Sequence, residues 1–461
     1  MIKISVTIRI YLTIVFSFFS LLSNAQQLAF PGAEGYGRFA KGGRGGDVYH
    51  VVNLNDNGAG SLRYGLETAL GPRTIVFSIS GNITLSKKLV VNTPSITIAG
   101  QTAPGDGITI AGNSLYIQAD DIIIRYIRVR FGDKSGQQAD AVSITRGKNI
   151  ILDHVSASWS VDETLSCQSN HVDLLTVQWC MISESLQNSI HEKGAHGYGG
   201  IIGASHQSFH HNLYAHHSSR SPKVTGRRHC EVDFRNNVIY NWGFNNCYDG
   251  TASYMNWVNN YYKAGPATQE KVRNRIFQLS DAEIEDVKNN SPEDSKAYET
   301  TLYADGNFVD GSESITNNNW NGGIDFVNGA SETKNRSRSA AFQAPAITQQ
   351  TALNAYPSVV AAAGASLVRD AIDQRISQEV LDGTFTYGKK GLIDSPEDVK
   401  GLPVLKTLPA PIDTDKDGIP DAWEKKHGLN PNEPDDRNRY ASTGYTMLEV
   451  YLNDLLVSGK K

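Results

Sequence analysis

Short apolar runs that return at a nearly regular spacing are the feature that most limits how this chain can fold. No amphipathic stretch of helix length lies between them from about residue 48 to residue 263. The runs are rich in β-branched residues, have about the length of a strand and are separated by Gly, Asn and Asp. Examples are Thr74–Ile79, Ile96–Ile98, Ile108–Ile110, Ile122–Val129, Ile150–Val155 and Leu174–Ile182. The pattern predicts a domain built from strands.

Residue pairs in similar contexts mark the period of this repeat. The pairs at 126–127, 154–155, 180–181, 212–213, 237–238 and 260–261 are separated by 28, 26, 32, 25 and 23 residues. An antiparallel sandwich or barrel is the usual alternative, but hairpin signals such as Asn-Gly are scarce here. A drifting period in the twenties favours a parallel β-helix, in which each coil stacks on the one before. Asn212, Asn237 and Asn260 would then form a ladder of side-chain amides.

The composition changes after residue 265. Residues 266–347 are rich in Asn, Ser, Asp and Glu, which is typical of loops that decorate a core. Residues 348–382 carry apolar side chains at helical spacing, and we expect them to cap one end of the solenoid. The predicted organisation is a signal at 1–25, a β-helix domain at 26–265, a loop-rich part at 266–347, a helical cap at 348–405, and a linker with an acidic loop at 406–461.

The first 25 residues have the order of a secretion signal. Lys3 and Arg9 precede an apolar stretch of 13 residues, Ile10–Leu22, and Ser23–Ala25 fits a cleavage site. A membrane anchor or a buried strand is the alternative, but this stretch is short for a bilayer span, and no later segment is long and apolar enough to cross a membrane. We expect a secreted or periplasmic monomer cleaved after Ala25.

In an exported chain the four cysteines could form up to two disulfides or remain buried thiols, and the sequence leaves both open. They are Cys167, Cys180, Cys230 and Cys247. Charge is unevenly distributed: residues 26–265 carry 20 basic and 18 acidic residues, whereas residues 266–461 carry 21 and 30. The first part therefore presents no electrostatic barrier to an acidic ligand.

The acidic loop at 413–424 matches a twelve-residue EF-hand calcium loop. Acidic residues occupy positions 1, 3, 5, 9 and 12, and Gly418 occupies position 6. A proline-rich stretch precedes the loop, so the pattern is closer to half-EF-hand loops of the dockerin or thrombospondin type. The alternative is an acidic turn with an Asp helix cap. The predicted structural calcium ligands are Asp413, Asp415, Asp417, the carbonyl of Ile419, Asp421 and Glu424.

Several further motifs together resemble one known family. They are Phe30–Arg38, Gly60–Arg63, Asp140–Ile144, Ile151–His154, Asp162, Arg220–Lys223 and the Asn-Asn pairs at 236–237 and 259–260. Over about 30–265 the chain resembles the family 1 polysaccharide lyases, the pectate lyases, which are right-handed parallel β-helices. The tail at 444–453 looks like the ends of secreted bacterial lyases of this kind.

The resemblance implies β-elimination of polygalacturonate, an acidic polysaccharide, with Ca²⁺ as cofactor and no nucleic acid as partner. Calcium neutralises the uronate carboxylate so that the proton at C5 can be removed. The family's catalytic base falls on Arg220, although arginine ordinarily stays protonated. The family's second arginine falls on Thr225, a departure that Arg227 and Arg228 could compensate.

The resemblance also implies a calcium site for the substrate. Its acidic positions carry over onto Asp140 and Asp162, whereas two others fall on Gln138 and Ser166, and Glu163 could rebuild part of the site. Substrate carboxylates are expected to meet Lys193 and Lys223, although a solvated loop is an equal alternative for Lys193. Asp153 and His154 are expected to be structural. The histidines at 210, 211, 216 and 217 cannot all converge on a metal, because alternate strand residues face opposite ways.

Three alternative functions remain open. A polygalacturonase would need paired carboxylates and a Gly-His-Gly signature, whereas residues 194–197 read Gly-Ala-His-Gly. A pectin lyase, or another uronate lyase, would share the fold, but a pectin lyase is expected to lack the calcium acids. A non-catalytic carbohydrate-binding β-helix would show binding without turnover.

Overall fold

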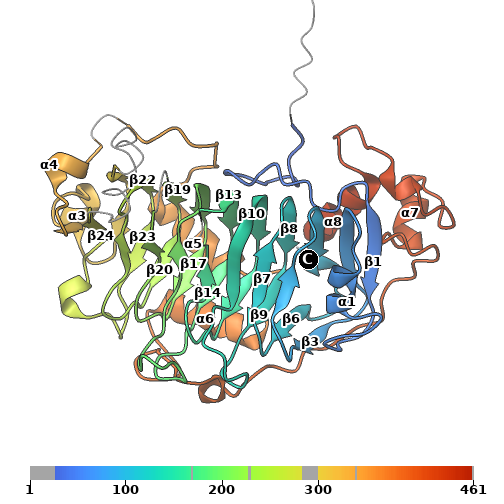
Figure 1. Cartoon of the computed structure of the whole chain (residues 1–461), viewed down its shortest axis with the longest axis horizontal. Helices are drawn as coiled ribbons and strands as arrows, with labels where there is room; N and C mark the ends of the chain where they lie inside the picture. The colour runs from blue at the N-terminus through green and yellow to red at the C-terminus, as the bar shows by residue number, and fades with distance from the viewer. Residues whose placement is uncertain (1–25, 168–169, 227–229, 283–298, 338–339, 459–461) are drawn as a thin grey trace, which may run out of the picture.

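The computed structural model describes residues 26–167, 170–226, 230–282, 299–337 and 340–458. The strands form parallel sheets along a solenoid, with successive coils side by side (Figure 1). The first sheet consists of β1 (Asp47–Val51), β2 (Arg73–Phe77), β5 (Ile96–Ala99), β8 (Ile122–Arg125), β10 (Val142–Asp153), β13 (Val172–Gln178), β16 (His206–His210), β19 (Cys230–Arg235), β22 (Ser253–Val258) and β25 (Thr301–Asp305).

Two further parallel faces complete each coil. The second sheet runs through β3 (Gly81–Thr84), β6 (Ile108–Ala111), β9 (Ile127–Arg130), β11 (Ser156–Ser158), β14 (Met181–Ser183), β17 (Leu213–Ala215), β20 (Val238–Tyr240), β23 (Tyr261–Lys263) and β26 (Phe308–Val309). The third face holds β4 (Leu89–Val91), β7 (Leu115–Gln118), the first half of β10, β12 (Leu165–Ser166), β15 (Ile201–Ile202), β18 (Lys223–Val224), β21 (Cys247–Asp249), β24 (Phe277–Ser280) and β27 (Ile324–Val327). The predicted parallel β-helix is confirmed.

Identical positions of successive coils stack inside the solenoid. In the register of β19 and β22, Phe234 lies opposite Trp257, and their rings are stacked with centroids 4.1 Å apart. Trp257 in turn contacts the edge of Phe277 at 4.8 Å. The aliphatic and aromatic side chains of the three faces therefore form one continuous buried core.

The asparagine ladder is present and longer than predicted. The side-chain amide of Asn212 donates to Asn237 (3.0 Å), that of Asn237 to Asn260 (3.1 Å), and that of Asn260 to Asn307 (2.9 Å). The side-chain amide of Asn307 in turn donates to Asn319 at 2.9 Å, which extends the ladder by one more residue. Each amide is buried, and the ladder satisfies its polar atoms where the first sheet turns into the second.

The boundary predicted at residue 265 is wrong, because the solenoid continues to Val327. β24 to β27 extend the three faces, and β22 pairs with β25 although 42 residues separate Val258 from Thr301. The long connection between β24 and β25 interrupts the period, so the repeat could not be followed beyond Asn260. All four cysteines are buried free thiols, which decides between the two open alternatives.

The helices lie at the ends and along the side of the solenoid. α1 (Leu62–Glu67) covers the first coil, where Leu62 and Leu66 join the core, while α3 (Glu313–Asn317) and α4 (Glu332–Asn335) lie at the other end (Figure 1). Short 3-10 turns occur at η1 (Gly100–Thr102), η2 (Glu270–Val272), η4 (Pro396–Val399) and η5 (Asp436–Asn438). Within the described residues, no helix combines the length and the apolar character that crossing a membrane requires.

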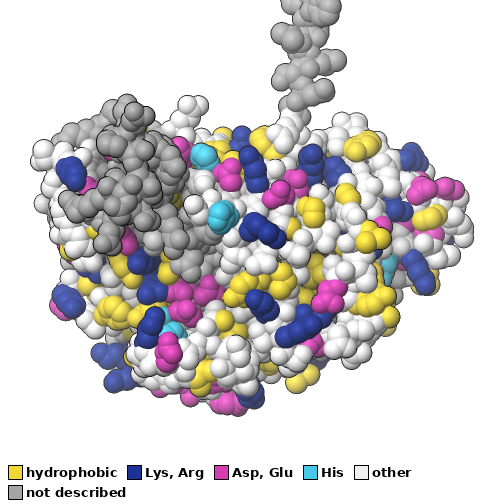
Figure 2. Space-filling model, viewed as in Figure 1, with side chains coloured by type: hydrophobic (Ala, Val, Ile, Leu, Met, Phe, Trp, Pro, Cys, Tyr) yellow, Lys and Arg dark blue, Asp and Glu magenta, His cyan; other side chains and the backbone are white. Residues whose placement is uncertain are grey.

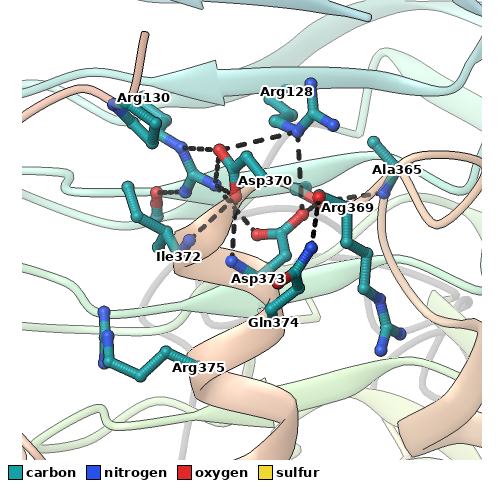
Figure 3. Close-up of polar contacts among 12 residues, drawn as sticks. Arg128, Arg130, Ala365, Arg369, Asp370, Ile372, Asp373, Gln374 and Arg375 are labelled. Carbon is teal, nitrogen blue, oxygen red and sulfur yellow. Dashed lines mark hydrogen bonds and ion pairs between the residues drawn. The ribbon is translucent and has the colours of Figure 1, made fainter. Parts of the chain in front are cut away.

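The segment predicted as an end cap lies along the second sheet instead. It contains α5 (Ala352–Ala362), which contacts β20 and β23, and α6 (Ala371–Asp382). Figure 3 shows how α6 is fastened: Arg130 of β9 donates to Asp370 at 2.7 and 2.9 Å and to Asp373 at 2.9 Å. The predicted position at the end is wrong because buried arginines on the outer face of this sheet attract the acidic start of α6.

The C-terminal part returns to the start of the solenoid. α7 (Asp421–His427) and α8 (Met447–Ser458) lie beside β1, far from the helices that precede them in sequence (Figure 1). Arg44 pairs with Glu449 at 2.8 Å, and Arg125 donates to Asn453 at 3.0 Å. The two chain ends therefore pack on the same coils.

Candidate active site

Arg220 lies where the chain enters the third face, three residues before β18. Its guanidinium forms an ion pair with Glu163, lies 4.3 Å from the ring centre of Tyr198, and approaches the hydroxyl of Tyr248 at 3.4 Å. Its side chain is 20% exposed, so it remains reachable from solvent. The backbone at Arg220 has a φ of 60°, which turns the chain sharply before the cis bond between Ser221 and Pro222.

Three carboxylates from successive coils meet beside this arginine. Asp140 precedes the third-face half of β10, and Asp162 and Glu163 precede β12 on the next coil. One oxygen of each lies within 4.8 Å of the others, and the backbone NH of Glu163 donates to Asp140 at 3.2 Å. Asp140 and Glu163 are almost fully buried, at 7% and 2% exposure. The structure thus brings together Arg220, Asp140, Asp162 and Glu163, four of the residues that the resemblance singles out.

Burial and the charge of Asp162 raise the pKa of Asp140 to about 7. Burial also disfavours the charge of Asp162, but the hydrogen bond from His196 and the charges of His196 and His191 outweigh it and lower its pKa. Crowded carboxylates of this kind are stabilised by a cation, and hard oxygen ligands suit calcium. The residues present therefore fit a calcium ion, although Glu163 also forms the ion pair with Arg220.

Two histidines near Asp162 are additions that the sequence reasoning missed. His196 Nε2 lies 2.6 Å and His191 Nε2 3.9 Å from Asp162, and the two imidazole rings stack at 3.9 Å. Their loop is held in place where the NH of Gln187 donates to the carbonyl of Ile393 at 2.7 Å. The Gly-Ala-His-Gly run at 194–197 was the available signal. At the family's other acidic positions, Gln138 and Ser166 offer no carboxylate.

The structure describes two of the four predicted substrate-binding cations. Lys193 is exposed in the turn that follows His191, and Lys223 lies 3.4 Å from Asp249. Arg227 and Arg228 lie outside the described residues.

Asp153 and His154 lie at the opposite turn of the coil. Asp153 is buried and pairs with Arg125 at 2.8 Å, while the ring of His154 stacks on Tyr126 at 4.6 Å. They line a cavity of about 630 Å³ together with Trp179, on the turn between the first and second sheets. This cavity lies away from Arg220, and the contacts of Asp153 and His154 are those of a structural pair.

The four clustered histidines face separate partners. His211 stacks on Trp179 at 4.3 Å, His216 pairs with Glu379 at 3.0 Å, and His217 accepts from Ser185 at 2.7 Å. His210 is buried beside His211. Within the described residues they form no metal-binding group.

Four of the predicted C-terminal carboxylates also come together. Asp413, Asp415 and Asp417 form one close group, and Asp417 shares a second group with Glu424 and with Asp436, which the sequence reasoning missed. Burial and mutual repulsion raise the pKa of Asp417 to about 8 and that of Glu424 to about 7. The NH of Ile419 donates to Asp417 at 2.8 Å.

Asp421 lies outside both groups. Its carboxylate accepts from the backbone NH and the hydroxyl of Thr414, each at 2.9 Å, and it pairs with Lys425 at 3.7 Å. Figure 2 shows acidic side chains, interspersed with Lys and Arg, at the end of the molecule that carries α7.

Comparison with known proteins identifies relatives of this chain. No family model matches the chain. Its curated relatives include "Probable pectate lyase C" of Emericella nidulans, 38% identical over 442 residues that make up 95% of each chain, and that of Aspergillus flavus, 38% identical over 94% of each. These relatives are fungal, so the bacterial type inferred from the resemblance is not supported.

A solved structure supports the fold independently. The crystal structure of Jun a 1, the major allergen from cedar pollen, has a TM-score of 0.52 at 18% identity and covers 72% of this chain and 92% of its own. Together with the identity to the curated relatives over almost the whole length, these findings show that the chain belongs to the pectate lyases, a family of polysaccharide lyases.

Proposed function

We propose that this protein cleaves polygalacturonate by β-elimination, with Arg220 as the base. The observation that carries the proposal is the meeting of Arg220 with Asp140, Asp162 and Glu163 at one edge of the coils. The relatives named pectate lyases support the substrate class. The products would be 4,5-unsaturated oligogalacturonides.

The acidic group is suited to hold calcium against the substrate. When bound there, calcium would neutralise the C6 carboxylate of the sugar and stabilise the enolate-like charge that develops after loss of the C5 proton. Asp140, Asp162 and Glu163 would supply its oxygen ligands. His196 holds Asp162 in its charged form through the 2.6 Å contact.

Arg220 must lose a proton before it can accept the one at C5. Its ion pair with Glu163 favours the protonated guanidinium, because a nearby carboxylate stabilises the cation. We therefore propose that this ion pair opens in the substrate complex. A nitrogen of the neutral guanidine then takes the C5 proton, and the electron pair of that C–H bond forms the C4–C5 double bond. The bond from C4 to the leaving oxygen breaks, and this oxygen keeps the electron pair and takes a proton from water.

The remaining parts of the proposal concern binding and location. Lys193, Lys223, Arg227 and Arg228 would contact carboxylates of neighbouring sugar units, because each side chain is a cation and the substrate is a polyanion. The protein would be exported after cleavage behind Ala25, and it would act as a monomer. Amino-terminal sequencing of the exported protein and light scattering of the purified chain test these two points.

The decisive assay follows the ultraviolet absorbance of the unsaturated product on polygalacturonate, with calcium and with chelator. We expect a calcium-dependent signal that Arg220→Ala abolishes and that Arg273→Ala retains, since Arg273 is 44% exposed and, within the described residues, forms an ion pair only with Glu270. New reducing ends without absorbance would mean hydrolysis instead. Binding without turnover on polygalacturonate, pectin and alginate would mean a carbohydrate-binding module.

A further inference from the structure

We propose that the C-terminal segment binds one structural calcium ion through five carboxylates and that this ion fastens the segment onto the first coil of the solenoid. The ligands are Asp413, Asp415, Asp417 and Glu424 of the acidic loop, with Asp436 added from η5. This site involves none of the residues around Arg220 and does not rest on the proposed lyase mechanism.

Unpaired buried oxygens indicate that this group can bind a cation. Six carboxylate oxygens of the group are buried without a hydrogen-bond partner: one each from Asp413, Asp415, Asp417 and Asp436, and both from Glu424. Glu424 is 0% and Asp417 is 1% exposed. Burial of charged oxygens without a partner is costly, whereas calcium takes six to eight oxygen ligands. The number and chemistry of the unpaired atoms therefore match this ion.

The other oxygens of the same carboxylates hold the loop in shape. Asp413 accepts from the NH of Gly418 at 3.0 Å, and Asp417 accepts from that of Ile419 at 2.8 Å. Asp436 is oriented in the same way, because its second oxygen accepts from the NH of Asn430 at 2.8 Å. Each aspartate thus keeps its remaining oxygen directed at the group.

The protein itself supplies little positive charge here. Among the described residues, the one ion-pair partner of the five carboxylates is His50, 3.4 Å from Asp413. Arg437, next to Asp436, donates instead to the carbonyl of Gly46 at 3.3 Å and lies 3.9 Å from Asp435. A divalent cation is therefore the natural counter-charge.

The loop presses directly on the start of the solenoid. Ile419 is fully buried in a cluster with Leu448 and Tyr451 of α8, against which Val48 of β1 packs. His50 also reaches the carbonyl of Lys416 at 3.3 Å. Because these contacts depend on the shape of the loop, calcium would hold α7 and α8 against β1, the edge strand of the first sheet.

The test uses the full chain without substrate, stripped by chelator and titrated with calcium chloride. Bound calcium is counted by equilibrium dialysis, and urea midpoints and limited proteolysis are recorded at each calcium concentration. The variants are Glu424→Gln and Asp436→Asn. The control is Asp435→Asn, whose side chain is 86% exposed beside the site.

We expect the wild type and the control to bind calcium, to unfold at higher urea with it, and to resist cleavage of the C-terminal segment. Both site variants should bind this ion at least tenfold more weakly. In chelator Glu424→Gln should unfold at no lower urea than the wild type, because one repelling charge is gone, an effect that a merely structural glutamate would not show. An Asp162→Asn variant should keep the calcium-dependent midpoint, which separates this site from the active site.

The proposal is overturned if both site variants keep the full calcium-dependent shift, or if they lose stability equally with and without calcium. Asp436→Asn leaves the sequence of the twelve-residue loop unchanged. If Glu424→Gln fails to fold, the calcium binding and the calcium-dependent urea midpoint of Asp436→Asn alone test the proposal.

Discussion

The ion pairs that fasten α6 to the second sheet make a quantitative prediction about stability. Arg130 has a fully buried side chain, and its partners Asp370 and Asp373 are 1% and 0% exposed. Asp370→Asn removes one charge but keeps a side-chain oxygen for the start of α6, where Asp370 accepts from the NH groups of Ile372 (3.1 Å) and Asp373 (2.9 Å). The variant therefore separates the charge from the helix cap.

The expected loss follows from the charge left behind. Two arginines, Arg128 and Arg130, face two aspartates, so one positive charge becomes uncompensated in the buried network. Breaking a buried pair in this way costs about 3–5 kcal/mol. Asp370→Ala should lose about 1 kcal/mol more, because the cap is then lost as well.

The assay is the free energy of unfolding in urea, followed by tryptophan fluorescence. Glu397→Gln is the control, because its ion pair with Lys134 lies on the surface with side chains 64% and 78% exposed, and it should leave the transition unchanged. A loss below about 1 kcal/mol for Asp370→Asn would refute the reasoning, since the network would then be paired or hydrated in some other way.

Three more predictions concern His217, the asparagine ladder and Asp162. Burial lowers the pKa of His217 to about 3, so the unfolded chain takes up a proton near pH 6.5 while the folded chain does not. The free energy of unfolding should therefore fall as the pH drops from about 6.5 towards 4. In urea unfolding, His217→Gln should flatten this part of the pH profile. Asn237→Ala leaves the side chains of Asn212 and Asn260 without their buried hydrogen-bond partner, and it should lower the free energy of unfolding by about 1–3 kcal/mol in the same assay. The same substitution at the exposed Asn321 should leave this free energy unchanged. Equal losses for the two variants would contradict a ladder role. Asp162→Asn should raise the calcium concentration for half-maximal product absorbance at least tenfold, and an unchanged value would remove Asp162 from the proposed site.

Local pattern was enough for the solenoid and for part of each site. The strand period predicts stacked coils, and Asn212, Asn237 and Asn260 predict the ladder, because identical turn positions of neighbouring coils must meet. The same regularity brings Asp140 and Asp162 together once the coils stack. The spacing of the acidic loop predicts five converging carboxylates, because a twelve-residue loop closes on itself, and four of them do converge, whereas Asp421 accepts from Thr414 instead.

Contacts between distant segments were decided only by the tertiary structure. The position of α6 depends on Arg130, 240 residues before Asp370, and no local pattern encodes that pairing. Asp436 joins the acidic loop from a separate turn, and His196 reaches Asp162 from a loop on the next coil. Sequence periodicity specifies what repeats from coil to coil, whereas these partners are single residues brought together by packing, which has no period to read.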